Sequence, residues 1–294
     1  MSVDEAWPAL PLREWQDTAQ TLHMWLQVAG KIRMMLTPPL NHWWHVTLTV
    51  TSRGLTTGPI PYADGAFEIQ FDFLQHQLHV GTCGGATTVL PLQPQSVALF
   101  YNSLMEALRG LGISVTINTK PQEVADPIDF EKDFTHKSYD PEYARRFFRA
   151  LSSTEKVFQR FRSGYVGKSS PVQFFWGSMD LACARFSGRP AVPPRPGRIA
   201  GISHEEVSVG FWPGEGLGAP AFYAYAAPHP GGLEADPIRP AAASWNPQIG
   251  EFILLYDDVR SAPDPSEALY AFCTSVYEAE AQRAHWDRAA LEEK

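Results

Sequence analysis

The feature that most constrains this fold is a long helical pattern of apolar residues. It ends at two prolines and is followed by the alternating pattern of a strand. Residues 12–36 carry apolar side chains at spacings of three and four, the period of a helix with one buried face. Pro38 and Pro39 end this helix, because proline lacks the backbone N–H that a helix interior needs. Residues 41–51 are rich in β-branched and aromatic side chains, and residues 67–73 alternate strictly, so both are predicted strands. The chain therefore combines helices with sheets.

The same order of elements recurs in the second part of the chain. Asp140 is a favoured N-cap residue, and a helix is predicted from there to about Arg162. The remaining predicted strands lie at 53–60, 77–82, 87–92, 113–118, 171–188 (two strands), 206–212, 221–226 and 251–256. The other predicted helices are 94–111 and 265–291, and loops are expected over 189–200 and 228–248.

Matching runs in the two parts predict an internal duplication. Gly30-Lys-Ile-Arg33 ends the first helix as Gln159-Arg-Phe-Arg162 ends the second, and an aromatic pair follows in each part. We expect an α+β fold whose two similar halves, 1–120 and 140–294, are joined by the linker 121–139 into one compact unit, residues 1–294. Each half is expected to be a mostly antiparallel sheet with long helices packed on one face.

The net charge indicates which class of partner to expect, and the cysteine content indicates the cellular compartment. The net charge of −8 argues against a nucleic-acid binder, which needs a basic surface. We also expect no signal peptide and no membrane span, because no apolar run is long enough. The three cysteines are far apart and form no CxxC pair, which is typical of free thiols in a reducing cytoplasm.

Tryptophan-containing runs spread over nearly the whole chain resemble one bacterial family. The runs are Trp7-Pro8, Leu22-His-Met-Trp25, Gly30-Lys-Ile-Arg33, His42-Trp-Trp-His45, Arg53-Gly-Leu-Thr56, Phe174-Phe-Trp-Gly-Ser178, Arg185-Phe-Ser-Gly-Arg189, Gly210-Phe-Trp-Pro-Gly214 and Trp286-Asp-Arg288. The chain is similar to a domain of unknown function, the DUF5996-type family. The resemblance implies no activity, and no catalytic residue follows from it.

Basic residues near the ends of the matching helices form one candidate site with aromatic residues of the strands. An arginine fork binds a carboxylate or phosphate through two hydrogen bonds, so this group suits an anionic ligand. The alternative is that these cations stabilise the C-termini of the helices. The candidate residues are Lys31, Arg33, Arg160, Arg162, Trp44, Trp176 and Trp212.

A second candidate group combines opposite charges within residues 171–214. Asp180 and Arg185 could form a buried ion pair, whose disruption would leave an unpaired charge. They could instead orient His204, which precedes two glutamates, as an acid–base catalyst. The sequence leaves the structural and the functional interpretation open.

Histidine spacing raises the question of a metal site. His42 and His45 stand three residues apart, but in a strand or turn such residues point to opposite faces. His45 could meet His23 and Asp72 in space and share a metal ion with them. We nevertheless expect hydrogen-bonded histidines, no metal and no cofactor, and we keep His45 as a ligand-binding candidate.

Two familiar catalytic patterns are not matched. Ser178 and Cys183 lack a nucleophile elbow and an adjacent activating histidine, so both are predicted to be packing residues. Residues 164–169 contain a Gly-Lys-Ser run, but the spacing of the glycines is wrong for a phosphate-binding loop.

These observations favour a small-molecule binding protein or an enzyme with an aromatic and arginine-lined cleft between the halves. The alternative is a non-catalytic protein-interaction or scaffolding module that uses exposed tryptophans and the proline-rich loops 190–198 and 227–240. A deep cleft containing Trp176, Arg185 and His204 would favour the first function. The sequence does not determine the oligomeric state.

Overall fold

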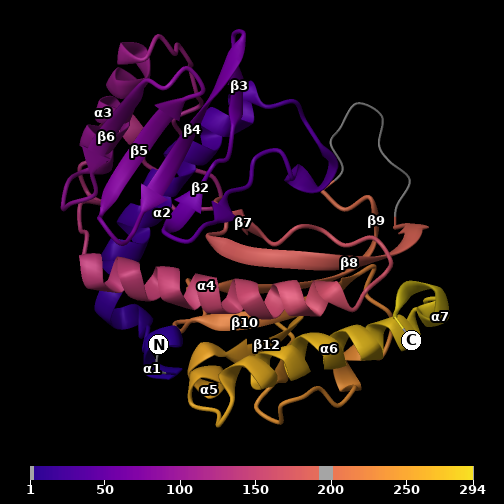
Figure 1. The fold of residues 1–294 in the computed structure, drawn as a ribbon. Helices are drawn as coiled ribbons and strands as arrows, with labels where there is room; N and C mark the ends of the chain where they lie inside the picture. The colour runs from indigo at the N-terminus through magenta and orange to yellow at the C-terminus, as the bar shows by residue number, and fades with distance from the viewer. Residues whose placement is uncertain (1–2, 192–200, 294) are drawn as a thin grey trace. The chain divides into compact units, whose positions relative to one another are not determined.

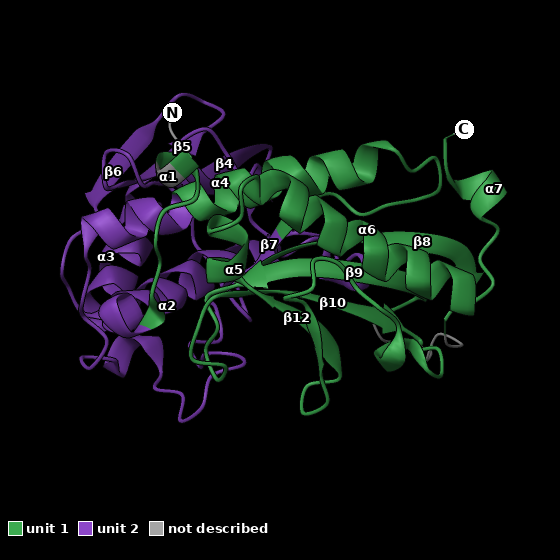
Figure 2. Cartoon of the chain, turned by 90° about the horizontal axis from the view of Figure 1, so that it is seen from below, with its two compact units in different colours: residues 1–12, 149–173, 180–294 green, residues 13–148, 174–179 purple. Residues whose placement is uncertain are grey.

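The computed structural model describes residues 3–191 and 201–293 and has an α+β fold with two antiparallel sheets (Figure 1). The chain divides into two compact units, coloured separately in Figure 2. Unit 1 comprises residues 1–12, 149–173 and 180–294, and unit 2 comprises residues 13–148 and 174–179. The predicted linker, residues 121–139, lies inside unit 2.

Unit 2 contains a six-stranded sheet and two main helices. Helix α2 (Leu12–Leu36) has the predicted bounds, and α3 (Val97–Gly110) starts after the N-cap Ser96, whose hydroxyl accepts a hydrogen bond from the Leu99 N–H. The strands are β1 (Thr49–Val50), β2 (Gly54–Thr56), β3 (Ile60–Tyr62), β4 (Gly65–Asp72), β5 (Gln77–Thr82) and β6 (Thr87–Pro91). Their order is β1-β2-β4-β5-β6, and β3 pairs with β4. The short 3-10 turns η1 (Asn41–Trp43) and η2 (Phe130–Lys132) also belong to this unit.

Strict alternation in β4 builds the core of unit 2. Phe67, Ile69 and Phe71 are fully or almost fully buried, while the residues between them point to the other face. The ring of Phe71 stacks 6.3 Å from Phe100 of α3, which in turn stacks 4.8 Å from Trp25 of α2. Helices α2 and α3 therefore pack on the apolar face of this sheet.

Unit 1 contains the second six-stranded sheet, with the order β11-β12-β10-β9-β8-β7. Its strands are β7 (Gln173–Phe175, on the unit boundary), β8 (Asp180–Pro190), β9 (His204–Trp212), β10 (Ala221–Ala227), β11 (Ser244–Asn246) and β12 (Glu251–Leu255). The helices are α1 (Val3–Ala6), α4 (Pro141–Ser163, in unit 1 from Arg149), α5 (Tyr256–Arg260), α6 (Pro265–Arg283) and α7 (Arg288–Leu291), with the turn η3 (Leu233–Ala235).

One face of the unit 1 sheet is apolar and covered by helices. Val207, Val209 and Phe211 of β9 are completely buried on this face. Helix α6 packs against β9 and β10, and α5 packs against β10 and β12. The side chains of Leu269 and Phe272 in α6 are also completely buried. The opposite face is polar and is described below.

The structure corrects several of the predicted elements. Only Thr49–Val50 of the predicted strand 41–51 forms a strand, because His42 and Trp43 adopt positive φ angles of 57° and 56°. Residues 113–118 form no strand, and the predicted long final helix stops at Arg283 before α7. Strand β11 interrupts the predicted loop 228–248. The predicted loop 189–200 lies mostly outside the described residues.

None of the helices within residues 3–191 and 201–293 combines the length and the apolar character needed to span a bilayer.

Candidate functional site

Carboxylates and phenols gather on the polar face of the unit 1 sheet. Antiparallel registers pair Ala182 with Gly210, Gly210 with Tyr223, and Tyr223 with Ile253. Side chains alternate between faces, so residues two apart along each strand share a face. This face, which we call the acidic face, carries Asp180, Ala182 and Ala184 of β8, Glu206, Ser208, Gly210 and Trp212 of β9, Tyr223 and Tyr225 of β10, and Glu251 of β12.

Small residues make room for the two tyrosine rings. A β-carbon at Gly210 would collide with the ring of Tyr223, so this ring lies across the glycine. The rings of Tyr223 and Tyr225 are stacked, with centroids 6.2 Å apart and an interplanar angle of 8°. Trp212 meets Tyr223 edge-on at 5.5 Å. The run that begins at Gly210 is therefore explained by the packing of Tyr223.

Each phenol donates a hydrogen bond to a carboxylate on this face. The Tyr223 hydroxyl donates to Oδ2 of Asp180, and the Tyr225 hydroxyl donates to Oε1 of Glu206 at 3.5 Å. Asp180 and Glu206 are buried, with 6% and 4% of their surface exposed. A buried carboxylate is costly unless hydrogen bonds satisfy it, so each phenol stabilises the carboxylate that it contacts.

Burial and mutual repulsion shift the protonation of this face. Burial, reinforced by the negative charge of Asp180, raises the pKa of Glu251 to about 7. Burial and the neighbouring carboxylates also raise the pKa of Tyr223 and of Tyr225, so both phenols are protonated hydrogen-bond donors at neutral pH. A carboxyl group whose pKa lies near 7 can donate or accept a proton at neutral pH.

The predicted ion pair between Asp180 and Arg185 is not formed. The two residues are five positions apart in β8, so their side chains lie on opposite faces of the sheet. The Arg185 guanidinium donates to the Phe161 carbonyl oxygen. Its central carbon lies 3.8 Å from the ring centroid of Phe161, 4.4 Å from that of Tyr277 and 4.9 Å from that of Tyr165. Arg185 is thus a core residue beneath α4 and α6, held by cation–π contacts.

His204 does not share this environment. It is exposed at the start of β9, and its Nδ1 lies 2.8 Å from the Ser203 hydroxyl. The structure therefore does not bring these three candidates together. Asp180 lies on the acidic face, Arg185 lies in the core, and His204 is exposed at the start of a strand.

In unit 2, the predicted cationic and aromatic candidates have individual partners. Lys31, only 1% exposed, donates to the Lys120 carbonyl at 2.6 Å, and Arg33 donates to the His45 carbonyl at 2.8 Å. Burial lowers the pKa of both side chains. The Leu40 N–H donates to His45 Nδ1 at 3.1 Å, and burial lowers the pKa of His45, so this imidazole is neutral at pH 7. Trp44 stacks on the ring of His42 with centroids 5.3 Å apart.

Trp176 is a packing residue of unit 2. Only 3% of it is exposed, its Nε1 donates to the Val46 carbonyl at 2.7 Å, and a β-carbon at Gly30 would collide with its ring. The glycine of the Gly30-Lys-Ile-Arg33 run is therefore required by close packing of this ring against α2.

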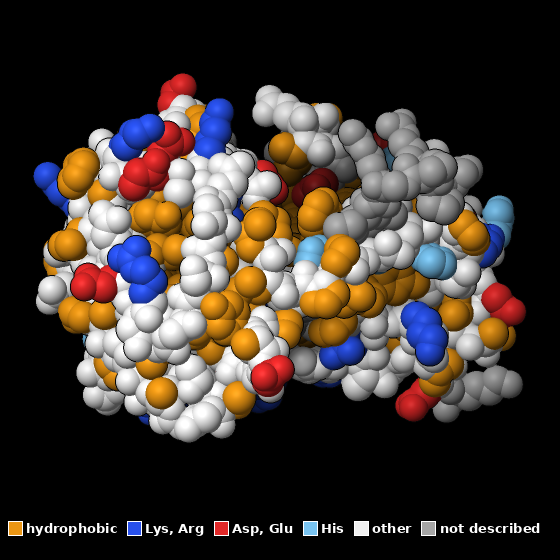
Figure 3. Space-filling view, turned by 90° about the horizontal axis from the view of Figure 1, so that it is seen from above, with side chains coloured by type: hydrophobic (Ala, Val, Ile, Leu, Met, Phe, Trp, Pro, Cys, Tyr) orange, Lys and Arg blue, Asp and Glu red, His pale blue; other side chains and the backbone are white. Residues whose placement is uncertain are grey.

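In unit 1, Arg160 and Arg162 also have partners. Arg160 pairs with Glu267 and lies 3.9 Å from the ring of Tyr270, while Arg162 donates to Gln159 Oε1 at 2.7 Å. On the face shown in Figure 3, Lys and Arg side chains are scattered among apolar and uncharged ones.

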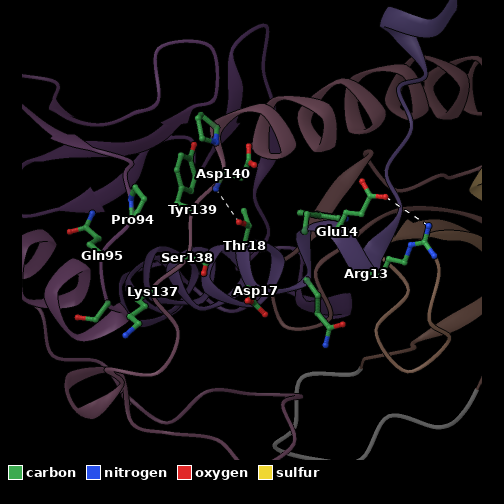
Figure 4. A pocket seen from close by; sticks show the side chains of 14 residues that line it. Arg13, Glu14, Asp17, Thr18, Pro94, Gln95, Lys137, Ser138, Tyr139 and Asp140 are labelled. Atoms are coloured by element: carbon green, nitrogen blue, oxygen red, sulfur yellow. Dashed lines mark hydrogen bonds and ion pairs between the residues drawn. The ribbon is translucent and has the colours of Figure 1, made fainter.

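One pocket is an open surface of unit 2 near the starts of α2 and α4. It measures about 770 Å³, and Figure 4 shows its side chains spread widely. The backbone groups there already have partners: the Asp140 N–H donates to Thr18 at 3.0 Å, and Asp140 Oδ1 accepts from Glu142 N–H at 2.8 Å. Among residues 3–191 and 201–293, no three His, Cys, Asp or Glu side chains are grouped to hold a metal ion.

Four residues of the acidic face escaped the sequence analysis: Glu206, Tyr223, Tyr225 and Glu251. A signal for them exists, because residues 206–210 and 222–226 alternate polar or glycine positions with apolar ones, as a strand with one polar face does.

Comparisons with curated proteins and with solved structures gave no match. A family model described as a family of unknown function matches residues 7–293, nearly the whole chain. The resemblance seen in the tryptophan-containing runs is therefore confirmed, and the chain belongs to the family of unknown function DUF5996.

Proposed function

We propose that this protein is an enzyme that performs acid–base chemistry on a small polar molecule bound at the acidic face of unit 1. The observation that supports this proposal is the geometry of the face. Asp180 accepts a hydrogen bond from Tyr223, and Glu251 lies on the same face. In the resting state Asp180 is the proton acceptor, and Glu251, with a pKa near 7, is the proton donor.

The residues of the face favour a neutral or cationic substrate that carries hydroxyl or amino groups. Asp180, Glu206 and Glu251 would repel an anion, while hydroxyl and amino groups can donate to these oxygens. The stacked rings of Tyr223 and Tyr225 supply an apolar surface beside the carboxyl groups. In one turnover the substrate would lose a proton to Asp180 and receive one from Glu251, and a proton passing from Asp180 to Glu251 would restore the starting state.

Proton titration and ligand-induced stabilisation test this function together. Carboxyl ¹³C chemical shifts should show Glu251 titrating near pH 7. A panel of monosaccharides, polyols and amino sugars, screened by thermal shift, should contain a compound that stabilises the wild type. Stabilisation should be lost in Asp180→Asn and retained in Asp258→Asn, a matched change at an exposed position of α5. Titration of Glu251 near its ordinary pKa, or equal stabilisation of Asp180→Asn, would refute the proposal.

An anionic ligand at Lys31 and Arg33 of unit 2 is a second proposal, carried over from the sequence. The partial desolvation of Lys31 and Arg33 supports it, since a desolvated cation attracts an anion more strongly. The anion would replace the carbonyl oxygens that these side chains now contact. Titration with inorganic phosphate, followed by ³¹P NMR, tests it, and no saturable binding would refute it.

The interaction-module alternative has one specific observation in its favour. Met35, Leu40 and Trp43 of unit 2 are exposed to 54%, 54% and 43%. If these side chains bind another protein or a second copy of this chain, Trp43→Ser should alter the sedimentation behaviour of the assembly.

The duplication, the single compact unit and the cytoplasmic location are proposals of the same kind. A long helix followed by an antiparallel meander occurs in each unit, α2 with β4–β5–β6 and α4 with β8–β9–β10, which supports duplication.

The chain passes between the units several times, which supports one cooperative unit, and a single calorimetric unfolding transition would test it. The three free cysteines support a reducing compartment, which cell fractionation tests.

A further inference from the structure

Unit 2 contains a small pocket of its own with mainly apolar walls. It measures about 260 Å³, and its lining includes Met34, Trp43, Val46, Phe175 and Trp176. The charged residue in its lining is Glu123. Its other polar lining residues are Gln122 and Ser178. Apolar walls with one acidic group are typical of sites that bind small organic cations.

Polar side chains of α2 hold the two loops that form this pocket. Gln27, which is completely buried, donates to the Gln122 carbonyl at 2.8 Å and accepts from the Gln122 N–H at 2.9 Å. His23 Nε2 lies 3.0 Å from the Trp176 carbonyl oxygen and 2.9 Å from that of Gly177, so it donates to them. One helix thus fixes the loop before Glu123 and the loop around Gly177. A site held in this way needs little ordering when a ligand binds.

Backbone strain is concentrated around the same pocket. Trp43 and Glu123, which line it, both have φ angles of 56°, and Met179, next to the lining residue Ser178, has a φ of 58°. A non-glycine residue in this conformation is strained and persists where the surrounding structure enforces it. Such residues are enriched at ligand-binding sites.

Glu123 carries its charge without a cationic partner. No Lys, Arg or His within residues 3–191 and 201–293 forms an ion pair with it. A β-carbon at Gly177 would come within 2.8 Å of Glu123 Oε1, so the carboxyl group lies close over the glycine. Burial raises the pKa of Glu123, which means that its carboxylate would gain from a positive charge nearby.

Trp43 adds an aromatic wall to this carboxylate. Its ring stacks on His45 with centroids 5.8 Å apart, yet 43% of the residue stays exposed. The Val46 N–H donates to the Trp43 carbonyl at 3.1 Å and holds the turn that presents the ring. Tryptophan is the best aromatic partner for an ammonium group.

We propose that this pocket binds a small ammonium compound, with the cation between the Trp43 ring and the Glu123 carboxylate. The bound group is a quaternary ammonium or a protonated amine, because both combine positive charge with an apolar surface that suits Met34, Val46 and Phe175. This site is independent of the acid–base chemistry assigned to unit 1.

Choline is a suitable probe, and 3,3-dimethyl-1-butanol is its neutral isostere. Saturation-transfer NMR and titration of the indole N–H signals of the full chain should show saturable choline binding. The neutral alcohol should bind at least about tenfold more weakly. Glu123→Gln should weaken choline binding about tenfold without unfolding the protein, while Glu106→Gln, an exposed position of α3, should leave it unchanged. Trp43→Ala should weaken it as well.

Three results would overturn the site. These are the absence of saturable choline binding up to about 50 mM, equal affinity in Glu123→Gln and the wild type, and equal affinity for the neutral isostere. Thermal melting of each variant provides the folding control, and Glu123→Gln preserves the shape of the side chain if Trp43→Ala fails to fold.

Discussion

The ring of Tyr223 occupies the space that a side chain at Gly210 would fill, and this places its hydroxyl on Asp180. The two residues are paired across β9 and β10. A backbone feature of one strand therefore positions the phenol of the next, and through it a buried carboxylate.

Replacing this glycine should disturb both stability and the acidic face. Gly210→Ala forces the Tyr223 ring away, and overpacking of this kind lowers the free energy of unfolding by about 1–3 kcal/mol. Denaturant unfolding measures the loss. Gly110→Ala is the matched control, because a β-carbon there meets nothing within 4 Å, and it should be neutral or slightly stabilising. Equal stability of the two variants would mean that Tyr223 does not rest on Gly210.

Local sequence patterns correctly predicted the helices and strands whose formation depends on neighbouring residues in the sequence. The apolar period and the proline pair defined helix 12–36, and strict alternation identified the strands around Phe67–Phe73 and 77–82. The run 41–51 failed because strand propensity cannot reveal that His42 and Trp43 adopt left-handed conformations. Residues 113–118 have strand-like composition but form no strand.

Most of the candidate site depends on sheet register, which the sequence did not provide. Asp180 and Trp212 were predicted from their residue types, and both lie on the acidic face. Glu251 is brought to the same face by the pairing of β12 with β10, two strands that are separated by a long connection in the sequence. Arg185 was predicted beside Asp180, but alternation within β8 separates them. A search of the sequence for polar positions at every second residue would have found Tyr223 and Tyr225.

The buried guanidinium of Arg185 should be replaceable by an apolar side chain of similar length. Arg185→Ala removes the contacts with three rings and leaves a cavity, so it should cost about 3 kcal/mol of unfolding free energy. Arg185→Met keeps most of the volume and removes a desolvated charge, so it should cost less. Chemical denaturation compares the two with Arg239→Ala, an exposed residue paired with Glu278, whose loss should stay below about 1 kcal/mol. A larger loss in Arg185→Met than in Arg185→Ala would contradict the cation–π arrangement.

The three cysteines should differ sharply in reactivity. Cys83 is exposed, whereas burial raises the pKa of Cys183 to about 12 and raises that of Cys273 as well. Ellman's reagent should therefore label one thiol per native chain quickly and all three after unfolding. Cys83→Ser should abolish the fast reaction. A second fast thiol in the native protein would show that the core beneath α6 opens readily.

The carboxyl group of Glu280 should make the protein less stable as the pH rises. Only 1% of this α6 residue is exposed, and its Oε2 has no hydrogen-bond partner among the described residues. Burial, with the charges of Glu206 and Glu205, raises its pKa to about 10 from an ordinary value of 4.5. The folded state thus binds the proton more tightly than the unfolded state. The resulting stabilisation is complete below pH 4.5 and is lost as the pH rises towards 10.

A glutamine side chain at position 280 does not ionise in this pH range. Glu280→Gln should therefore remove the loss of stability with rising pH that Glu280 causes. Thermal or urea unfolding between pH 5 and 9 should show a variant that is at least as stable as the wild type at pH 7. Its advantage should grow by at most about 1.4 kcal/mol per pH unit. Glu278→Gln, an exposed position on the same helix, should follow the wild-type curve within about 1 kcal/mol. Parallel curves for Glu280→Gln and the wild type would show that Glu280 is ionised in the folded protein, with its charge compensated by solvent or a rearranged side chain.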